Sequence, residues 1–296
     1  MKKILLLLSL ALTMTMTSCL EGEEPNTVIT ANYACYNNIE DMQNTPGSYE
    51  LKAGTYVFTM DLTDVNNLKL DLAIRGNFGE SGEVNLTLND LEMKLANYEY
   101  TFSAGSLTPE VADGIAGSHV ITNLKGTIHP YVISDDSYTS MRQILVYQIS
   151  FVLDGRYRVT AIDRNPYIFS QRTMATPTEG NSYSTDETQY EVRFSDTNKA
   201  NVLIYNARFV ENMPLISFTL KDIPVTLTSN GYILQIDEII PVLSTSDTPA
   251  TQYPISNFKL QMSGPDMSLH FNCVPNGTSN YSVTSTGSVY PPVSNQ

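Results

Sequence analysis

Much of the chain alternates between apolar and polar residues with a period of two. Thr55–Leu62, Leu68–Leu72 and Gln189–Phe194 show this alternation and are rich in Val, Leu, Thr and Tyr. Such runs are typical of β-strands with one buried face and one face toward water. No amphipathic helix of three turns follows residue 19. The pattern therefore predicts an all-β chain.

Turn residues separate the predicted strands. They are Arg75-Gly76-Asn77, Asp154-Gly155, Asn230-Gly231 and Asn276-Gly277. Asn230-Gly231 stands between two apolar runs and predicts a two-residue β-hairpin, because both residues tolerate positive φ.

The two halves of the chain carry the same blocks in the same order. Val84–Leu95 aligns without gaps on Ile216–Leu227. Further blocks pair Tyr56 with Tyr190, Tyr100 with Tyr232, Phe102 with Leu234, Leu107 with Ile239, Pro109 with Pro241, Ile121–Leu124 with Ile255–Phe258, and Tyr157–Thr160 with Tyr281–Thr284. This order predicts two copies of one domain, at 49–165 and 189–292. Each copy has seven or eight antiparallel strands in a small barrel or sandwich.

The segments outside the two copies have the composition of linkers. Residues 166–188 are rich in Pro, Thr, Ser and Gly and predict a linker. Residues 19–48, with Glu21, Glu23 and Glu24 near their start, predict an acidic flexible tether, and residues 293–296 form a tail.

One stretch of the second copy resembles a known family. Val202–Phe209 ends in an Asn-x-x-Phe element, followed by Met213-Pro214 and by Ile216–Pro224. This stretch is similar to the lipocalin-like (calycin-like) surface lipoproteins of Bacteroidetes, and the acidic residues after Cys19 resemble the surface-export signal of such lipoproteins. The first copy has Gly82-Glu83 in place of Met-Pro. The resemblance implies a small β-barrel and no established activity.

The N-terminal residues have the order of a bacterial lipoprotein signal. Lys2 and Lys3 are followed by the apolar run Ile4–Leu12 and by Ser18-Cys19. An apolar run this short does not span a bilayer, so residues 1–18 are predicted to be a removed signal peptide. Cys19 is predicted to carry lipid, which places the chain in the cell envelope, at the outer membrane and its surface.

Composition excludes some partners. The formal charge is −14, and it becomes −16 without Lys2 and Lys3. A chain this acidic is repelled by phosphate backbones, so nucleic-acid binding is not expected.

After lipidation of Cys19 two cysteines remain, Cys35 and Cys273. They are candidates for a disulfide in an oxidising compartment, and two free thiols are the alternative. Two cysteines far apart in sequence do not predict a zinc site.

The sequence contains no recognisable catalytic constellation. His119, His129 and His270 lie near no nucleophile motif and form no metal-binding pair. Asp135-Asp136 are read as a solvated loop, with calcium binding as the weaker alternative. Asp90 and Asp222 occupy equivalent positions, which predicts a structural role at a strand end through hydrogen bonds from backbone N–H groups.

Three functions remain as hypotheses. A binding protein for a small apolar molecule or a short glycan is favoured, although its ligand-binding residues cannot be named and Trp, a common sugar-stacking residue, is absent. Tyrosines can also stack on sugars, and they group at Tyr98/Tyr100, Tyr131/Tyr138 and Tyr281/Tyr290. The alternative is a structural or adhesive fimbrial-type subunit, but no basic residue for processing occurs from Leu20 to Leu51. An enzyme is not expected, and no cofactor or metal is predicted.

Overall fold

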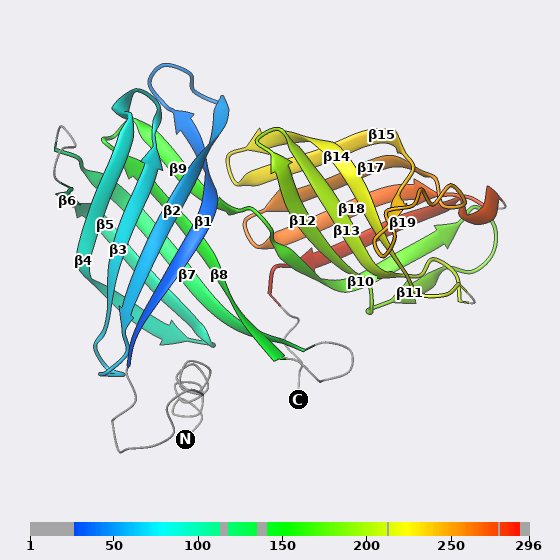
Figure 1. Cartoon of the computed structure of the whole chain (residues 1–296), viewed down its shortest axis with the longest axis horizontal. Coiled ribbons are helices and arrows are strands. Elements are labelled where there is room, and N and C mark those ends of the chain that lie inside the picture. The colour runs from blue at the N-terminus through cyan, green and yellow to red at the C-terminus, as the bar shows by residue number, and fades with distance from the viewer. Residues whose placement is uncertain (1–26, 113–117, 135–140, 212, 278, 291–296) are drawn as a thin grey trace. The chain divides into compact units, whose positions relative to one another are not determined.

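The computed structural model describes residues 27–112, 118–134, 141–211, 213–277 and 279–290. Its regular structure is almost entirely β-strand, which confirms the predicted fold class. The chain divides into two compact units, Met1–Ile162 and Asp163–Gln296, and each holds one closed barrel, called barrel 1 and barrel 2 below (Figure 1). Among the described residues, no helix has the length and apolar character needed to cross a bilayer.

Barrel 1 is a ring of eight antiparallel strands that follow one another in chain order. They are β1 (Val28–Asp41), β2 (Tyr49–Asp61), β3 (Leu68–Asn77), β4 (Glu83–Ala96), β5 (Glu99–Leu107), β7 (Ile121–Ser134), β8 (Met141–Leu153) and β9 (Tyr157–Asp163). β9 lies beside β1, which closes the ring. The short β6 (Glu110–Val111) pairs with β4, and the 3-10 helix η1 (Gly79–Ser81) lies between β3 and β4.

Barrel 2 repeats this ring. Its strands are β10 (Tyr167–Pro177), β12 (Gln189–Asp196), β13 (Lys199–Ala207), β14 (Ile216–Thr228), β15 (Gly231–Ile239), β17 (Ile255–Ser263), β18 (Asp266–Cys273) and β19 (Tyr281–Ser288). Pairing of β10 with β19 closes the ring. The short β16 (Val242–Leu243) pairs with β14 as β6 pairs with β4, β11 (Tyr183–Thr185) pairs with β10, and η2 (Pro275–Gly277) lies between β18 and β19.

The repeated sequence blocks fall on equivalent strands. Val84–Leu95 lies in β4 and Ile216–Leu227 in β14, while Tyr100 and Tyr232 each pair with a leucine one strand back, Leu95 and Leu227. The two barrels are therefore two copies of one eight-stranded ring, and the choice between barrel and sandwich is decided for the barrel.

The predicted tether and linker are wrong in part, because each contains the first strand of a barrel. β1 lies within residues 19–48, and β10 lies within residues 166–188. Both strands were missed because Asn, Thr and Ser interrupt their apolar positions. In β1, polar Asn37 is fully buried inside the barrel. An inward-facing polar residue hides the apolar alternation on which strand prediction depends.

The predicted turns have mixed outcomes. Asp154 and Gly155 both have positive φ and join β8 to β9, as predicted. The β14–β15 hairpin exists, but it turns at Ser229-Asn230, and Gly231 begins β15. A Cβ on Gly231 would lie 2.3 Å from the carbonyl oxygen of Met262, so glycine is required there by the neighbouring strand. Gly76 lies inside β3, so no turn occurs at that position.

Barrel 1 has two ends, the Asp41 end and the Val28 end. The Asp41 end carries the last residue of β1 and the β8–β9 turn, and the Val28 end carries the first residue of β1 and the β4–β5 turn. The corresponding ends of barrel 2 are the Pro177 end and the Tyr167 end, after the last and first residues of β10.

Candidate functional site

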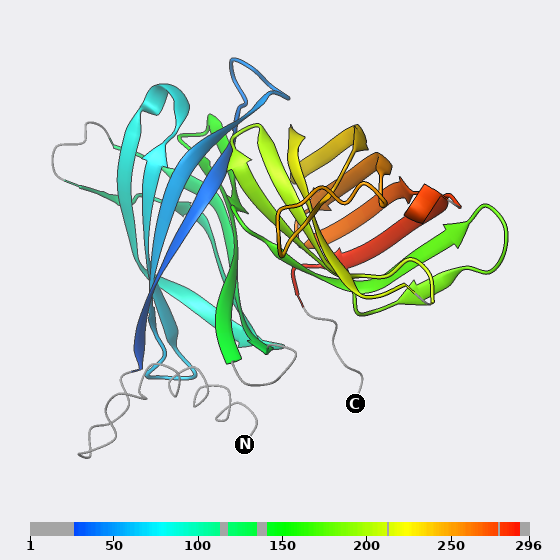
Figure 2. The same ribbon diagram turned by 45° about the vertical axis from the view of Figure 1, so that its right-hand side comes forward.

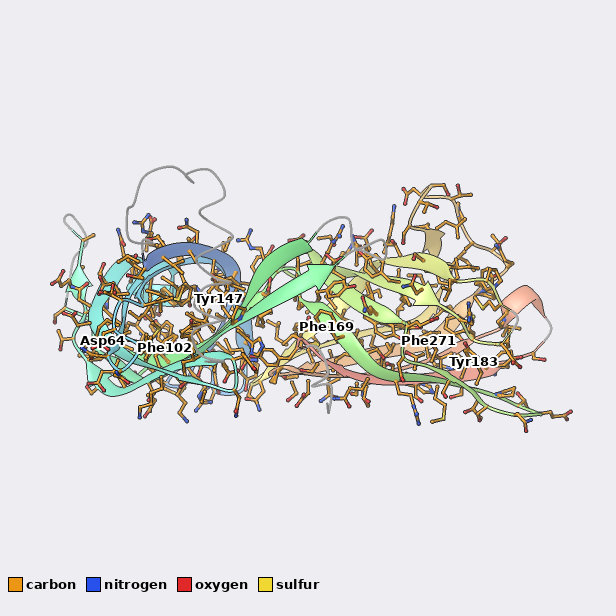
Figure 3. The ribbon with its side chains drawn as sticks, turned by 90° about the horizontal axis from the view of Figure 1, so that it is seen from below. Asp64, Phe102, Tyr147, Phe169, Tyr183 and Phe271 are labelled. Atoms are coloured by element: carbon orange, nitrogen blue, oxygen red, sulfur yellow. The ribbon has the colours of Figure 1, made fainter. Side chains whose placement is uncertain are left out.

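Side chains fill the middle of both barrels. The strands alternate, so every second residue points inward, and the inward set of barrel 1 forms one buried cluster of about thirty apolar side chains. Phe102 of barrel 1 and Phe271 of barrel 2 lie among these buried side chains (Figure 3). A ligand of either barrel must therefore bind toward one end.

The Asp41 end of barrel 1 and the Pro177 end of barrel 2 are closed in the same way. A phenylalanine that follows β3 or β13, Phe78 or Phe209, is completely buried. Phe78 packs on Phe151 with ring centroids 6.1 Å apart, and Phe209 packs on Phe271 at 5.6 Å. The Asn-x-x-Phe element of the sequence thus supplies the plug of barrel 2.

An ion cluster adds to the closure of barrel 1. Arg156 donates hydrogen bonds from Nε and Nη2 to the Asp41 carboxylate, at 3.1 and 2.6 Å, and from Nη1 to Glu80 at 2.7 Å. The guanidinium also lies 4.8 Å from the centre of the Tyr157 ring. The hydrogen bonds from Arg156 lower the pKa of Asp41 strongly. These contacts tie the end of β1, η1 and the β8–β9 turn together.

The Val28 end of barrel 1 is different. Four strands place directly paired residues in one inward-facing row there: Leu95 pairs with Tyr100, Tyr100 with Ile128, and Ile128 with Tyr147. Beyond this row the β7–β8 hairpin continues for six more residue pairs, to Ser134 opposite Met141 (Figures 1 and 2). The row therefore lies below an extended part of the wall.

Aromatic rings form the base of this end. The Tyr147 ring stacks on Phe58 and on Tyr33, with a centroid distance of 4.6 Å in each pair. Phe58 meets Phe102 edge to face at 6.4 Å. Such stacked and edge-to-face pairs present a flat and rigid apolar surface.

Above these rings the inward-facing side chains are only partly covered. Ala31, Leu95 and Leu145 all belong to the inward face and are half-buried rather than buried. Tyr100, in contrast, is only 1% exposed, and its hydroxyl has no hydrogen-bond partner. Burial raises the pKa of Tyr100, so the hydroxyl stays protonated at neutral pH. The Val28 end thus combines a half-covered apolar rim, an aromatic base and the buried hydroxyl of Tyr100.

A small polar cluster lies deeper in each barrel. In barrel 1 the Tyr56 hydroxyl donates to Asn37 Oδ1 at 2.6 Å, and Asn37 Nδ2 has no partner. In barrel 2 the equivalent Tyr190 bonds Thr173 at 3.1 Å, and Thr173 also bonds Ser285 at 3.2 Å. Burial raises the pKa of Tyr190 to about 12. All these side chains are buried, so the clusters specify packing and do not contact solvent.

Asp90 and Asp222 are structural equivalents, but the mechanism differs from the predicted one. Both have positive φ, 56° and 55°, and sit at a β-bulge inside β4 and β14, not at a strand end. Their backbone N–H groups donate to the side chains of Asp71 and Asn201, at 2.9 Å in each case. The bulge bends the strand, so that β4 pairs with β6 before it and with β5 after it.

The three histidines lie apart from one another. His119 Nδ1 lies 2.8 Å from Asp154 Oδ2, and the Val120 N–H donates to the same carboxylate, which fixes the chain before β7 to the β8–β9 turn. His129 lies in β7, where burial lowers its pKa. His270 lies on the exposed face of β18 beside Ser282. Within the described residues, no group of three His, Cys, Asp or Glu side chains could hold a metal ion.

Cys35 and Cys273 form no disulfide, which is the alternative given for them above. Both are fully buried, each inside a different barrel. Each occupies an inward-facing strand position, and burial raises the pKa of Cys273 to about 12. They act as small core residues.

Some of the remaining predicted residues lie outside the described structure, and the others differ in how far they are exposed. Cys19, Asp135, Asp136 and Tyr138 lie outside the described residues, as does the side chain of Tyr131. Tyr98 is exposed while its predicted neighbour Tyr100 is buried, and Tyr281 and Tyr290 are half-buried. The predicted tyrosine groups therefore form no common stacking surface in the described parts.

Sequence analysis missed the aromatic base of the Val28 end. Tyr33 falls in the predicted tether, and Phe58 and Tyr147 are far apart in the chain. The signal that could have revealed it is the alternation Ile29, Tyr33, Cys35, whose members are all buried on one face of β1.

Comparisons with known proteins give little. No family model matches the chain, and no curated protein matches its sequence. Among solved structures, a crystal structure of a "putative outer membrane protein" from Bacteroides fragilis matches over 88% of this chain and 97% of its own. Its sequence identity is 12% and its TM-score is 0.35, so it supports no conclusion about the fold, function or location of this chain.

Proposed function

We propose that this chain is a lipid-anchored binding protein of the cell envelope, and that barrel 1 binds a small apolar molecule at its Val28 end. The observation that carries the proposal is the set of half-covered inward-facing side chains, Ala31, Leu95 and Leu145, above the stacked rings of Tyr33, Phe58 and Tyr147. Apolar surface of this kind, surrounded by a wall, is typical of small-molecule sites.

Three features support this end over the others. The Asp41 end is plugged by Phe78 and the Arg156 ion cluster. In barrel 2 the β17–β18 hairpin stops one pair beyond the equivalent row, at Ser263 opposite Asp266. Val289 is also buried at the Tyr167 end, where its N–H donates to the Pro265 carbonyl. Aromatic side chains at the Val28 end favour a flat apolar ligand over a saturated chain.

Binding is tested with the purified full chain and N-phenyl-1-naphthylamine, a flat apolar dye whose fluorescence rises when it leaves water. Leu95→Arg places a charge on the rim of barrel 1, and Leu227→Arg is the matched control at the equivalent position of barrel 2. We expect the wild type and Leu227→Arg to bind the dye and Leu95→Arg to lose at least tenfold in affinity. A wild type without dye binding would refute the binding function, and equal binding by both variants would refute the site.

The lipid anchor depends on the N-terminal sequence alone. The basic Lys2 and Lys3, the apolar run and Ser18-Cys19 support it. Cys19→Ala is expected to move the protein from the membrane fraction to the soluble fraction of the cells that produce it. Retention of this variant in the membrane fraction would refute the anchor and leave the binding site untouched.

A further inference from the structure

We propose that the ligand of barrel 1 is not a pure hydrocarbon but carries one hydrogen-bonding oxygen or nitrogen, which pairs with the hydroxyl of Tyr100. This inference rests on the proposed function and names the class of molecule that the Val28 end takes: a flat apolar body with a single hydroxyl, carbonyl or comparable polar group.

The unpaired hydroxyl of Tyr100 carries a free-energy cost. The Tyr100 hydroxyl is buried and has no partner in the described structure. A buried polar group without a hydrogen bond costs about 1–3 kcal/mol relative to a paired one. Phenylalanine would fill the same space without this cost, and a ligand with a polar group would remove the cost at Tyr100.

Tyr100 lies beside the surface that the ligand is proposed to cover. Tyr100 pairs directly with Leu95, which is one of the half-covered rim residues, and it shares an inward-facing row with Tyr147. A flat molecule that covers Leu95 and lies on the rings below therefore lies next to Tyr100. Leu95 and Ile128 offer no polar side-chain atom in this row, and the Tyr100 hydroxyl has no partner in the described structure.

The equivalent position in barrel 2 is occupied by Tyr232. Tyr232 also has a buried hydroxyl without a partner. Its row contains Leu227, Met262 and Met267, its ring meets Phe194 edge to face at 5.1 Å, and both methionines are buried. Leu227 is half-buried, as Leu95 is, but barrel 2 has Met267 at the position of Tyr147, so its row lacks the ring that stacks on Phe58 and Tyr33 in barrel 1. Tyr232 is therefore the matched control for Tyr100.

The test compares two probes of nearly equal size and shape, 2-naphthol and 2-methylnaphthalene, which differ in a hydroxyl against a methyl group. Their affinities for the purified full chain are measured by displacement of N-phenyl-1-naphthylamine and checked by calorimetry. Although 2-methylnaphthalene is the more apolar probe, we expect the wild type to bind 2-naphthol roughly three- to tenfold more tightly, the gain of about one hydrogen bond. Tyr100→Phe should abolish this preference and leave 2-methylnaphthalene binding within twofold. Tyr232→Phe should keep the preference.

Tyr100→Phe is expected to fold, because it removes an unpaired polar group and should melt at the same temperature as the wild type or higher. A change in its probe affinities therefore reports on binding and not on unfolding. If Tyr100→Phe retains the preference for 2-naphthol, or if Tyr232→Phe loses it, the inference is wrong while the binding function stands. An equal affinity of the wild type for both probes also overturns the inference. Failure of both probes and the dye to bind overturns the proposed function itself.

Discussion

The two barrels share one ring of strands but fill it with different side chains. At three equivalent inward positions barrel 1 has Tyr33, Phe58 and Tyr147, and barrel 2 has Ile168, Val192 and Met267. The aromatic set stacks into a rigid base below a half-covered rim, while the aliphatic set accompanies a shorter hairpin and a buried Val289. The two barrels thus share the backbone pairing and differ in their interiors, because only total volume and the inward pattern are required to close a barrel.

Equivalent positions of the two barrels differ in side-chain size, and a larger side chain at one position is offset by a smaller one at the paired position. Phe102 lies opposite Gly126 in barrel 1, and the equivalent pair in barrel 2 is Leu234 opposite Leu260. A Cβ on Gly126 would lie 2.0 Å from the Phe102 ring, so the glycine exists to admit the ring. Asn37 and Gly54 of barrel 1 are matched in the same way, because the Asn37 amide occupies the space that a side chain at position 54 would need.

The largest effect is expected from removing the first strand of either barrel. A fragment of residues 163–290 contains β10 and should give a β-type circular dichroism spectrum and a cooperative melt, whereas 189–292 lacks β10 and should not fold. The matched pair in barrel 1 is 27–163 against 49–165, which lacks β1. An open ring leaves unpaired strand edges and an uncovered core. A cooperative melt of 189–292 would show that β10 is dispensable.

The second effect tests the exchange of volume. Gly126→Ala should destabilise barrel 1 by about 1–3 kcal/mol through overpacking against Phe102. The double variant Phe102→Leu/Gly126→Leu, which copies the pair of barrel 2, should recover most of this loss. Chemical denaturation of the full chain measures both. A double variant less stable than Gly126→Ala would mean that the two interiors are not interchangeable at this row.

The third effect compares how much the buried polar cluster of each barrel contributes to stability. Tyr56→Phe leaves Asn37 Oδ1 buried without its 2.6 Å donor and should cost about 1–2 kcal/mol. Tyr190→Phe should cost less than half as much, because Thr173 keeps its bond to Ser285. Denaturant midpoints of the two variants provide the comparison. Equal losses would show that the denser hydrogen bonding of barrel 2 gives no advantage.

The smallest effect concerns the shared bulge. Asp90→Ala and Asp222→Ala should each cost about 1 kcal/mol, because a left-handed backbone is strained in a residue with a Cβ that lacks a polar side chain. Asp90→Gly and Asp222→Gly should cost less than the alanine variants in both barrels. If glycine and alanine give the same melting temperature, the backbone conformation is not the reason for an aspartate at these positions.

The strands and the aromatic base that sequence analysis missed all depend on contacts between residues that are far apart in the chain. β1 and β10 carry buried polar residues, Asn37, Ser170 and Thr173, at inward positions where the apolar pattern expects Val or Ile. Those residues are tolerated only because Tyr56, Tyr190 and Ser285 reach them from other strands. Partners so distant in the chain leave no local signal.

The sequence by itself determined that the chain is all-β and that its halves repeat, because alternation and turn residues act over a few neighbouring positions. It could also align Tyr100 with Tyr232 and Asp90 with Asp222. Only the tertiary structure decided that the strands close into rings, that Cys35 and Cys273 lie in separate cores, and that Tyr33, Phe58 and Tyr147 meet. Register between distant strands sets these contacts, and register depends on the packing of the whole ring.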